Sequence, residues 1–293
     1  MLRTPHIVVI NLDRDVDRLA HMHRQFDQLG LSFERFAAIN GADVPALLRA
    51  YFPSHDRSPL SPGEIGCYAS HLAICQRIVE GSLPPVVCVL EDDVALTPDF
   101  ASVLSALLTD AADGWDFIRL SNETKRAVMP LARLSDRFTL VRYTNVPGST
   151  GASLISRSGA EKFLKQAPRS LPVDQDLRRV WVWGLNTLGV TPAPVRRDVL
   201  NTSSIDAMAD EGWRSDRSRI ARLRRRRMLE APNRHFHGMR TFGAHRWIAA
   251  ELINVAAAIS PRARRTQTLA RLSELLSPNV AQLRYAPELS HAP

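Results

Sequence analysis

The fold class is decided by residues 7–38, which read IVVINLDRDVDRLAHMHRQFDQLGLSFERFAA. Ile7-Val8-Val9-Ile10 is a continuous β-branched run, typical of a strand that is buried on both faces. A helix is expected from about Val16 to Leu29, because apolar residues recur there at helical spacing and Gly30 follows as a stop signal. Phe33 to Ala38 then gives a second strand. This β-α-β opening predicts an α/β fold with a mostly parallel central sheet.

The alternation of helices and strands continues downstream. Ser61-Pro62-Gly63-Glu64 is a capping box with proline at the first helical position, so a largely buried helix should run to about Glu80. Ser158 with Glu161 should cap a short helix that continues through Leu164. Further strands are expected at Val86–Leu90, Trp115–Leu120, Thr139–Thr144 and Ala152–Ser156, and helices at Arg214–Leu229, Trp247–Ile259 and Leu269–Leu276.

Charge divides the chain into two parts. The net charge of +8 combines 22 Lys and Arg against 25 Asp and Glu in residues 1–213 with 16 against 5 in residues 214–293. Eight arginines and one acid lie within Arg214–Arg227. We therefore expect a main α/β domain over residues 1–213 and a basic, mainly helical extension over residues 214–293, which we call the basic tail. Such a tail either meets an anionic surface, such as a membrane, or forms a solvated helical face that pairs with the acidic body.

Several classes of protein are disfavoured by what the sequence lacks. The first residues carry no signal-peptide pattern, and the longest apolar stretch, Trp247–Ile259, is thirteen residues long and contains Glu251 and Asn254. The three cysteines form no disulfide framework, which fits a reducing compartment. We therefore expect a cytoplasmic protein, associated peripherally with the inner face of the cytoplasmic membrane if the tail binds lipid. Neither a G-x-G-x-x-G nor a P-loop motif occurs, which disfavours dinucleotide dehydrogenases and P-loop enzymes.

The residues with the clearest chemistry are Glu91-Asp92-Asp93, which we call the acidic block. A buried parallel strand, Val86–Leu90, delivers these three carboxylates at its C-terminal end, where open α/β sheets bind ligands. Crowding them is unfavourable unless a cation or strong hydrogen-bond donors neutralise them. A divalent ion would do so and would suit a substrate with a diphosphate group. A solvated acidic turn is the other interpretation.

A family resemblance rests on a series of sequence blocks. They are Ile10-Asn11-Leu12-Asp13-Arg14 with Asp17-Arg18; Arg35-Phe36-Ala37-Ala38-Ile39-Asn40-Gly41; Leu60 to Cys67 with Ser70-His71-Leu72; Leu90-Glu91-Asp92-Asp93-Val94; Gly151 to Ser156 with Gly159-Ala160; and Pro172-Val173-Asp174. In this order they resemble glycosyltransferase family 25, which includes bacterial lipooligosaccharide galactosyltransferases and collagen galactosyltransferases. The resemblance covers about residues 6–206 and leaves the basic tail unmatched.

The resemblance implies a GT-A-like fold and transfer of a hexose, with inversion, from a UDP-sugar to a saccharide or lipid-linked saccharide acceptor in the cell envelope. It also implies a divalent metal, Mn²⁺ or Mg²⁺, held at Glu91 and Asp93. The catalytic base is then Asp174 or Asp176, since an inverting transfer needs a carboxylate to take the acceptor's proton. We assign seven residues to the donor site: Asn11, Arg14, Arg18, Glu64, Ser70, His71 and Asp92.

Structural alternatives remain for several of these residues. Asp176 fits equally well as an acid near a helix N-terminus, and Arg18 as a surface ion pair with Asp13 or Asp17. Glu64 and Ser70 could serve only as a cap and a small contact, and His71 as a hydrogen-bonded core residue.

Two other functions compete with glycosyl transfer. The first is a non-catalytic body whose tail binds an anionic polymer, either membrane or nucleic acid; the tail lacks the regular aromatic residues and motifs of nucleic-acid binders. The second is a nucleotidyltransferase, which would need a glycine- and lysine-rich nucleotide loop that is missing near the N-terminus.

Overall fold

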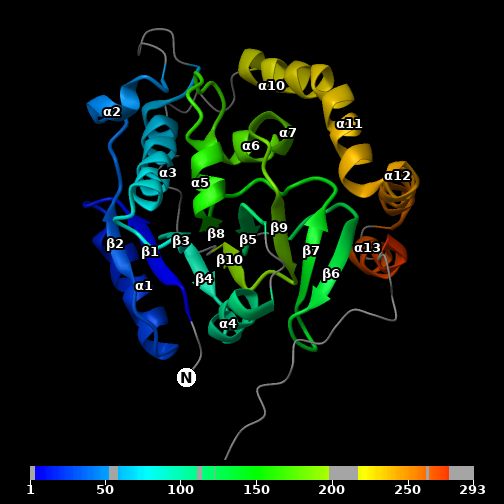
Figure 1. Ribbon diagram of the computed structural model, residues 1–293, viewed down its shortest axis with the longest axis horizontal. Helices are drawn as coiled ribbons and strands as arrows, with labels where there is room; N and C mark the ends of the chain where they lie inside the picture. Colours follow the sequence, from blue (N-terminus) through cyan, green and yellow to red (C-terminus); the bar gives the residue numbers. More distant parts are fainter. Residues whose placement is uncertain are drawn as a thin grey trace, which may run out of the picture.

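The computed structural model describes residues 4–52, 59–110, 114–121, 123–197, 217–261 and 264–276. An eight-stranded sheet runs through the molecule in the order β2-β1-β3-β8-β5-β9-β7-β6 (Figure 1). Its strands are β1 (His6–Asn11), β2 (Glu34–Ala37), β3 (Val86–Glu91), β5 (Phe117–Arg119), β6 (Val128–Arg133), β7 (Thr139–Tyr143), β8 (Ala152–Ser156) and β9 (Thr187–Thr191). A small second sheet pairs β4 (Val94–Leu96) with β10 (Val195–Arg197).

The sheet is mixed, although one strand direction dominates. β1 pairs in parallel with both β2 and β3, and β5 pairs in parallel with β9. β8 is antiparallel to its neighbours β3 and β5, and β7 is antiparallel to β9 and β6. The predicted α/β class is therefore confirmed, with β7 and β8 running against the other strands of the sheet.

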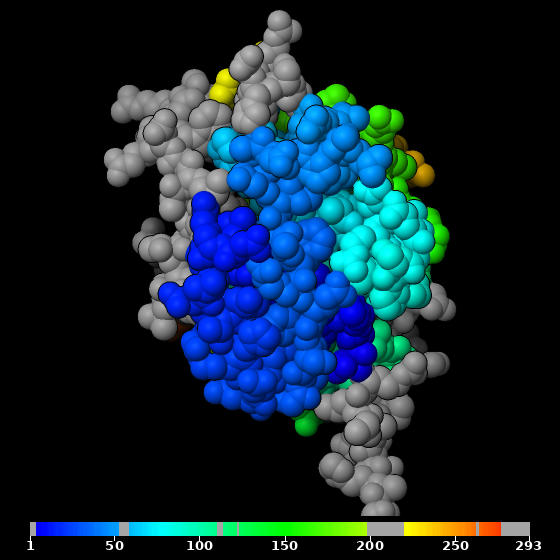
Figure 2. All heavy atoms as spheres, turned by 90° about the vertical axis from the view of Figure 1, so that its left-hand side faces the viewer, coloured from blue at the N-terminus to red at the C-terminus, as the bar shows by residue number. Residues whose placement is uncertain are grey.

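Helices cover both faces of the sheet. On one face, α1 (Val16–Gln28) and α4 (Phe100–Asp110) pack Met22, Phe26 and Leu104 against the buried side chains that β1, β3 and β5 present on that face. On the other, α3 (Pro62–Glu80), α5 (Arg157–Phe163) and α7 (Val180–Trp183) pack around Tyr68 and Phe163. The short helices α2 (Ala46–Arg49) and α6 (Val173–Leu177) complete this layer. Figure 2 shows that α1, α2 and α3, in blue to cyan, cover the edge of the molecule next to β2.

Two helix starts test the capping predictions. The capping box of α3 is confirmed, since Ser61 Oγ accepts from the Glu64 N–H at 3.2 Å and Glu64 Oε2 accepts from the Ser61 N–H at 2.9 Å. The prediction for α5 was wrong by two residues. Ser156 caps this helix by accepting from the Gly159 N–H at 3.1 Å, whereas Ser158 donates to Asp116 at 2.7 Å. Both serines precede the same helix, and a hydrogen bond to the distant Asp116 decides between them.

The C-terminal helices pack against the sheet as part of the same molecule. They are α10 (Arg217–Leu229), α11 (Ala231–Phe242), α12 (Ala244–Ile259) and α13 (Arg265–Ser273), followed by a 3₁₀ turn at Glu274–Leu276 (Figure 1). Phe242, Trp247 and Ile253 form a core with Ala127 and Met129 beside β6. The predicted helical C-terminal region is confirmed, and its boundary at residue 213 lies outside the described residues. Every helix in the described ranges is too short or too polar to cross a bilayer.

Side chains of the C-terminal helices also satisfy the backbone at β6, the edge strand of the sheet. Asn254 Oδ1 accepts from the Ala127 N–H at 2.8 Å, and Ser273 Oγ accepts from the Val128 N–H at 3.2 Å. An uncovered edge strand invites pairing with other chains, so α12 and α13 protect this edge. Removing them would expose both apolar surface and unpaired backbone groups.

Candidate active site

The acidic block lies where two parallel strands end side by side. β1 and β3 pair in register through Ile10 and Glu91, so the residues that follow both strands meet at one edge of the sheet. Asp92 and Asp93 form a turn between β3 and β4. Glu91 and Asp93 line two adjoining cavities, which therefore meet at the acidic block.

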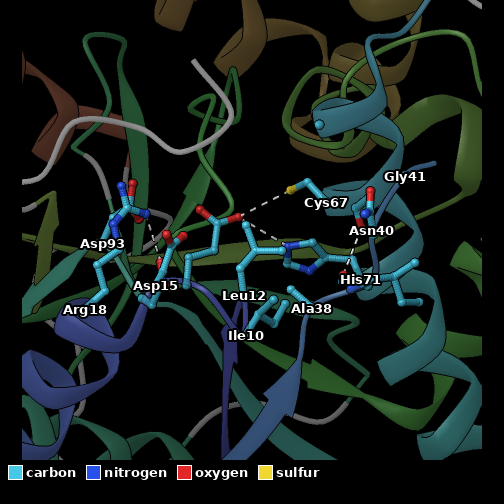
Figure 3. A pocket seen from close by; sticks show the side chains of 16 residues that line it. Ile10, Leu12, Asp15, Arg18, Ala38, Asn40, Gly41, Cys67, His71 and Asp93 are labelled. Atoms are coloured by element: carbon cyan, nitrogen blue, oxygen red, sulfur yellow. Dashed lines mark hydrogen bonds and ion pairs between the residues drawn. The ribbon is translucent and has the colours of Figure 1, made fainter. Parts of the chain in front are cut away.

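The first cavity has a volume of about 90 Å³ and a largely apolar wall. Ile10 and Leu12 contribute to that wall from the end of β1, and Ala38 and Ile39 from the segment after β2. Arg18, His71 and Asp92 are among its polar residues. Figure 3 shows Arg18 and Asp93 on one side of this cavity and Cys67 and His71 on the other.

The first cavity depends on close packing between α3 and the segment at residues 38–41. A Cβ atom on Gly41 would collide with the backbone oxygen of Pro62, and one on Gly66 with that of Ile39. Ser70 joins the same two parts, because its Oγ donates to the Gly66 carbonyl at 2.8 Å and accepts from the Ile39 N–H at 2.9 Å. Ser70 therefore lines the cavity and also fixes its shape.

The first two carboxylates of the acidic block are held by different partners. Glu91 Oε1 accepts from Thr150 Oγ1 at 2.5 Å and lies 3.3 Å from His71 Nε2. Asp92 accepts from Asn11 Nδ2 at 2.7 Å and from Arg18 at 3.1 Å. Burial would raise the pKa of Glu91, but His71, Thr150 and the buried guanidinium of Arg119 outweigh it and lower that pKa.

Asp93 differs from Glu91 and Asp92 in its hydrogen bonding. Within the described ranges, no group donates a hydrogen bond to it. Burial, reinforced by the negative charges of Glu91 and Asp92, raises the pKa of Asp93 to about 6. A half-buried carboxylate facing two cavities, without a donor of its own, has the properties expected of a group that binds a cation.

The second cavity, of about 260 Å³, extends from the acidic block to Asp174 at the start of α6. Glu64, Thr150 and Arg197 also line it. Burial raises the pKa of Asp174, although hydrogen bonds from Gln175 and the charge of Arg119 oppose this effect. Gln175 Nε2 donates to Asp174 Oδ2 at 2.7 Å and so fixes the orientation of the carboxylate.

Asp176 lies on the other side of α6, in the protein core. Its carboxylate accepts from the Tyr68 hydroxyl at 2.8 Å and pairs with Arg179 at 2.8 Å and Arg169 at 3.8 Å. Only 2% of its surface is exposed, and it lines neither cavity. The structure therefore brings Asp174, and not Asp176, to the acidic block.

The profile of glycosyltransferase family 25, described as LPS biosynthesis protein, matches residues 4–177. The chain belongs to glycosyltransferase family 25. The matched range contains the ends of β1 and β3, the acidic block and α6. It ends before the basic tail begins. This finding confirms the resemblance drawn from the sequence blocks.

Individual relatives agree with the family assignment. The chain is 32% identical over 188 residues to a glycosyltransferase 25 family member of Aedes aegypti. The aligned region covers 58% of this chain and 30% of the relative. It is 31% identical over 185 residues to procollagen galactosyltransferase 1-B of Xenopus laevis, again covering 58% of this chain and 30% of the relative. The match thus spans about a third of these longer proteins.

A solved structure of a glycosyltransferase involved in glycosylation of the major capsid of PBCV-1 aligns with a TM-score of 0.40 and 10% identity. It covers 69% of this chain and 95% of that one.

The residues assigned to the donor site in this family 25 chain take three kinds of position. Arg18, Ser70, His71 and Asp92 line the first cavity, and Glu64 lines the second while also capping α3. Asn11 is buried behind the cavity, where it accepts from Arg35 and donates to Asp92. Arg14 is half exposed, pairs with Asp15 at 3.9 Å and lines neither cavity.

The residues present fit a divalent ion with oxygen ligands. Asp93 has no donor, and Glu91 Oε2 receives no hydrogen bond from the described residues, so both offer carboxylate oxygens where the cavities meet. Mg²⁺ and Mn²⁺ favour such ligands. The ligand atoms of Cys67, His71 and Glu91 also lie within 4.8 Å of one another. Burial, followed by the charges of Glu91 and Asp174, raises the pKa of the Cys67 thiol well above its usual value, so the thiol is neutral in the metal-free protein.

Several residues that shape the site were not predicted from the sequence. Thr150 and Gln175 orient Glu91 and Asp174, and their roles depend on loops that no local pattern specifies. Arg119 is fully buried in β5, and its positive charge acts on both Glu91 and Asp174. An arginine at the end of a predicted buried strand is the one signal that could have found it.

Proposed function

We propose that the chain is a metal-dependent, inverting glycosyltransferase. It moves a hexose, galactose or glucose, from a UDP-sugar to a saccharide acceptor of lipopolysaccharide or another cell-envelope glycan. One observation carries the proposal: Asp93, a carboxylate with no hydrogen-bond donor among the described residues, lines two cavities, and the candidate base Asp174 lines the far wall of one of them. The family description and the galactosyltransferase name of a relative support it.

The first cavity suits the nucleotide of the donor. Its apolar wall at Ile10, Leu12 and Ile39 offers a surface on which a base can pack, and Arg18 offers a planar cation nearby. A divalent ion at Glu91 and Asp93 would neutralise the diphosphate and stabilise the charge that develops on it as the leaving group. Asn11 keeps Asp92 in place from behind.

The second cavity suits the sugar and the acceptor hydroxyl. In an inverting transfer, the acceptor oxygen attacks the anomeric carbon, the bond from that carbon to the diphosphate oxygen breaks, and the hydroxyl proton passes to a base. Asp174 is in position to take this proton, and its raised pKa makes it a stronger base than an exposed aspartate. Gln175 holds the carboxylate of Asp174 in one orientation, so that it stays directed toward the acceptor hydroxyl during the reaction.

The basic tail suits an anionic lipid surface. Arg222, Arg224 and Arg225 are exposed on α10. On α12, four exposed aliphatic side chains recur at helical spacing, namely Ile248, Leu252, Val255 and Ile259. Basic residues near an anionic membrane contribute about 1 kcal/mol each, and an apolar helix face adds shallow insertion. We infer a cytoplasmic enzyme that meets lipid-linked acceptors at the inner face of the membrane.

A donor screen tests the proposed function. The full chain is incubated with UDP-galactose, UDP-glucose, GDP-mannose and CMP-sialic acid in Mn²⁺, in Mg²⁺ or in EDTA, and the released nucleotide is measured. We expect a UDP-hexose to be hydrolysed slowly without acceptor and EDTA to abolish this reaction. Hydrolysis that is unchanged in EDTA, or absent for every UDP-sugar, would contradict the proposal.

A further inference from the structure

A third cavity, with a mostly apolar lining and several charged side chains, lies between the main domain and the basic tail. It measures about 320 Å³ and is lined by residues of α6 and α7 on one side and of α10 and α11 on the other. These four helices lie in the upper part of Figure 1. Five arginines line it, at positions 178, 179, 226, 227 and 234, with Glu230 as the carboxylate among them. We call this cavity the arginine pocket.

Among the described residues, positive charges outnumber negative charges in the arginine pocket. Glu230 pairs with Arg179 at 2.6 Å and with Arg226 at 3.1 Å, and Arg179 also pairs with Asp176. Arg178, Arg227 and Arg234 have no carboxylate partner among the residues that the structure describes. Their contacts are with backbone carbonyls, amide side chains and His235.

The crowded positive charges disfavour the charged form of Arg178. Burial, followed by the positive charge of Arg227, lowers the pKa of Arg178, and Arg234 acts in the same direction. An anion in the pocket would relieve this repulsion and could accept paired hydrogen bonds from the guanidinium forks. A planar carboxylate and a tetrahedral phosphate each present a pair of oxygens that such forks bind.

The remaining lining suits a sugar that carries the anion. Trp181 lines the pocket, and its buried Nε1–H has no acceptor among the described residues. Leu223 and Met228 add apolar surface. Ligand sites commonly combine apolar walls with a few convergent polar groups in a volume of roughly 300–1,000 Å³, and an indole beside arginines can contact both a sugar ring and its charged substituent.

Gln175 connects the arginine pocket to the candidate base. Its Oε1 accepts from Arg227 at 2.7 Å and from Arg178 at 3.3 Å, while its Nε2 donates to Asp174 at 2.7 Å. Gly148, in the wall of the second cavity, lies against Asp174, Gln175 and Arg178 together. The arginine pocket and the second cavity are therefore neighbours that share α6 as a wall.

We propose that the arginine pocket binds a phosphate or carboxylate group of the acceptor saccharide and thereby places an acceptor hydroxyl beside Asp174. This inference rests on the proposed function and specifies its acceptor as an anionic sugar. The donor diphosphate belongs at the acidic block, on the far side of the second cavity, so the two anions occupy separate sites. The basic tail then supplies half of a substrate site.

Direct binding tests the inference without turnover. Full-length protein is titrated calorimetrically, in EDTA and without donor, with glucose 6-phosphate, glucuronic acid, glucose and inorganic phosphate. The variants are Arg227→Gln and Arg234→Gln, and the matched control is Arg225→Gln, an exposed arginine of α10 that does not line the pocket. We expect at least one of the two anionic sugars to bind, glucose not to bind, and each pocket variant to weaken binding about tenfold, with the control unchanged.

Three results would overturn the proposal. The first is an equal loss in all three variants, which would indicate a general positive field. The second is inorganic phosphate binding as tightly as the anionic sugars, which would indicate a site for a free anion. The third is that the protein binds phosphatidylglycerol vesicles but none of the soluble sugars, and that vesicle binding is weakened by Arg227→Gln and not by Arg225→Gln. This would indicate that the pocket contacts lipid.

The donor screen separates failure of this inference from failure of the proposed function. Donor hydrolysis without anionic-sugar binding would refute the inference alone. Anionic-sugar binding without donor hydrolysis would refute the proposed function.

Discussion

Replacing Asp93 with asparagine should stabilise the metal-free protein while it abolishes metal-dependent turnover. The substitution keeps the side chain's volume and removes a charge that the fold disfavours. Burial and the neighbouring charges of Glu91 and Asp92 raise the pKa of Asp93 from 3.8 to about 6. Opposite effects on stability and activity are expected where a strained group is retained for function.

The sign and size of the stability change follow from proton linkage. A carboxyl whose pKa is higher in the folded state binds its proton more tightly when folded, so its ionisation weakens folding above pH 3.8, and fully above pH 6. A shift of about 2 pKa units corresponds to about 3 kcal/mol. Because the side chain keeps some solvent contact, screening reduces this to about 1–2 kcal/mol.

Urea denaturation in EDTA at pH 7.5 and pH 4.5 measures this effect. We expect Asp93→Asn to raise the free energy of unfolding at pH 7.5 and to approach the wild type at pH 4.5. Asp43→Asn, at an exposed carboxylate, is the matched control and should change little at either pH. With Mn²⁺, the wild type should gain stability by mass action and the variant should not. A variant that is less stable than the wild type at pH 7.5 would refute the reasoning.

Three further predictions concern α6 and the basic tail. Asp174→Asn should lower kcat for hexosyl transfer by roughly 10²-fold or more with the donor KM little changed, and full activity would place the base elsewhere. Asp176→Asn should lower the urea midpoint through a loss of about 3–5 kcal/mol, because it leaves the buried guanidinium of Arg169 without a carboxylate partner; an unchanged midpoint would contradict this role. Co-sedimentation with phosphatidylglycerol vesicles should fall at high salt and in the double variant Arg224→Gln/Arg225→Gln. Binding that is indifferent to salt, to lipid charge and to the variant would argue against membrane contact.

Features with short-range causes were predictable from the sequence. The β-branched run at residues 7–10 and the capping box at Ser61 specify a strand and a helix start by local chemistry. The position of the acidic block at a sheet edge also followed, because strands that pair in parallel end at the same edge.

Elements that depend on distant packing were missed. β6 contains Pro130, which argues against a strand, but the strand lies at the sheet edge and its register shifts beside that proline. α11 contains Gly238, a weak helix former, at a point where the Trp247 ring leaves no room for a Cβ atom. In both cases a tertiary contact outweighs the local preference.

The candidate site was predictable only in part for a similar reason. Asp174 and Asp176 are two residues apart, and residues at this spacing do not share a helix face. Which of them meets the cavity depends on how α6 packs, and the contacts of Tyr68 and Arg179 with Asp176 decide it. The arginine pocket combines residues 145–181 with residues 223–234, an arrangement that no sequence pattern encodes.

In the proposed function, Asp93 would hold a divalent ion that neutralises the diphosphate of the donor. Equilibrium binding of UDP, measured calorimetrically with and without Mn²⁺, tests it most directly in the wild type, Asp93→Asn and Asp174→Asn. We expect Mn²⁺ to tighten UDP binding in the wild type and in Asp174→Asn, but not in Asp93→Asn. Binding of UDP to Asp93→Asn that retains its full dependence on Mn²⁺ would contradict it.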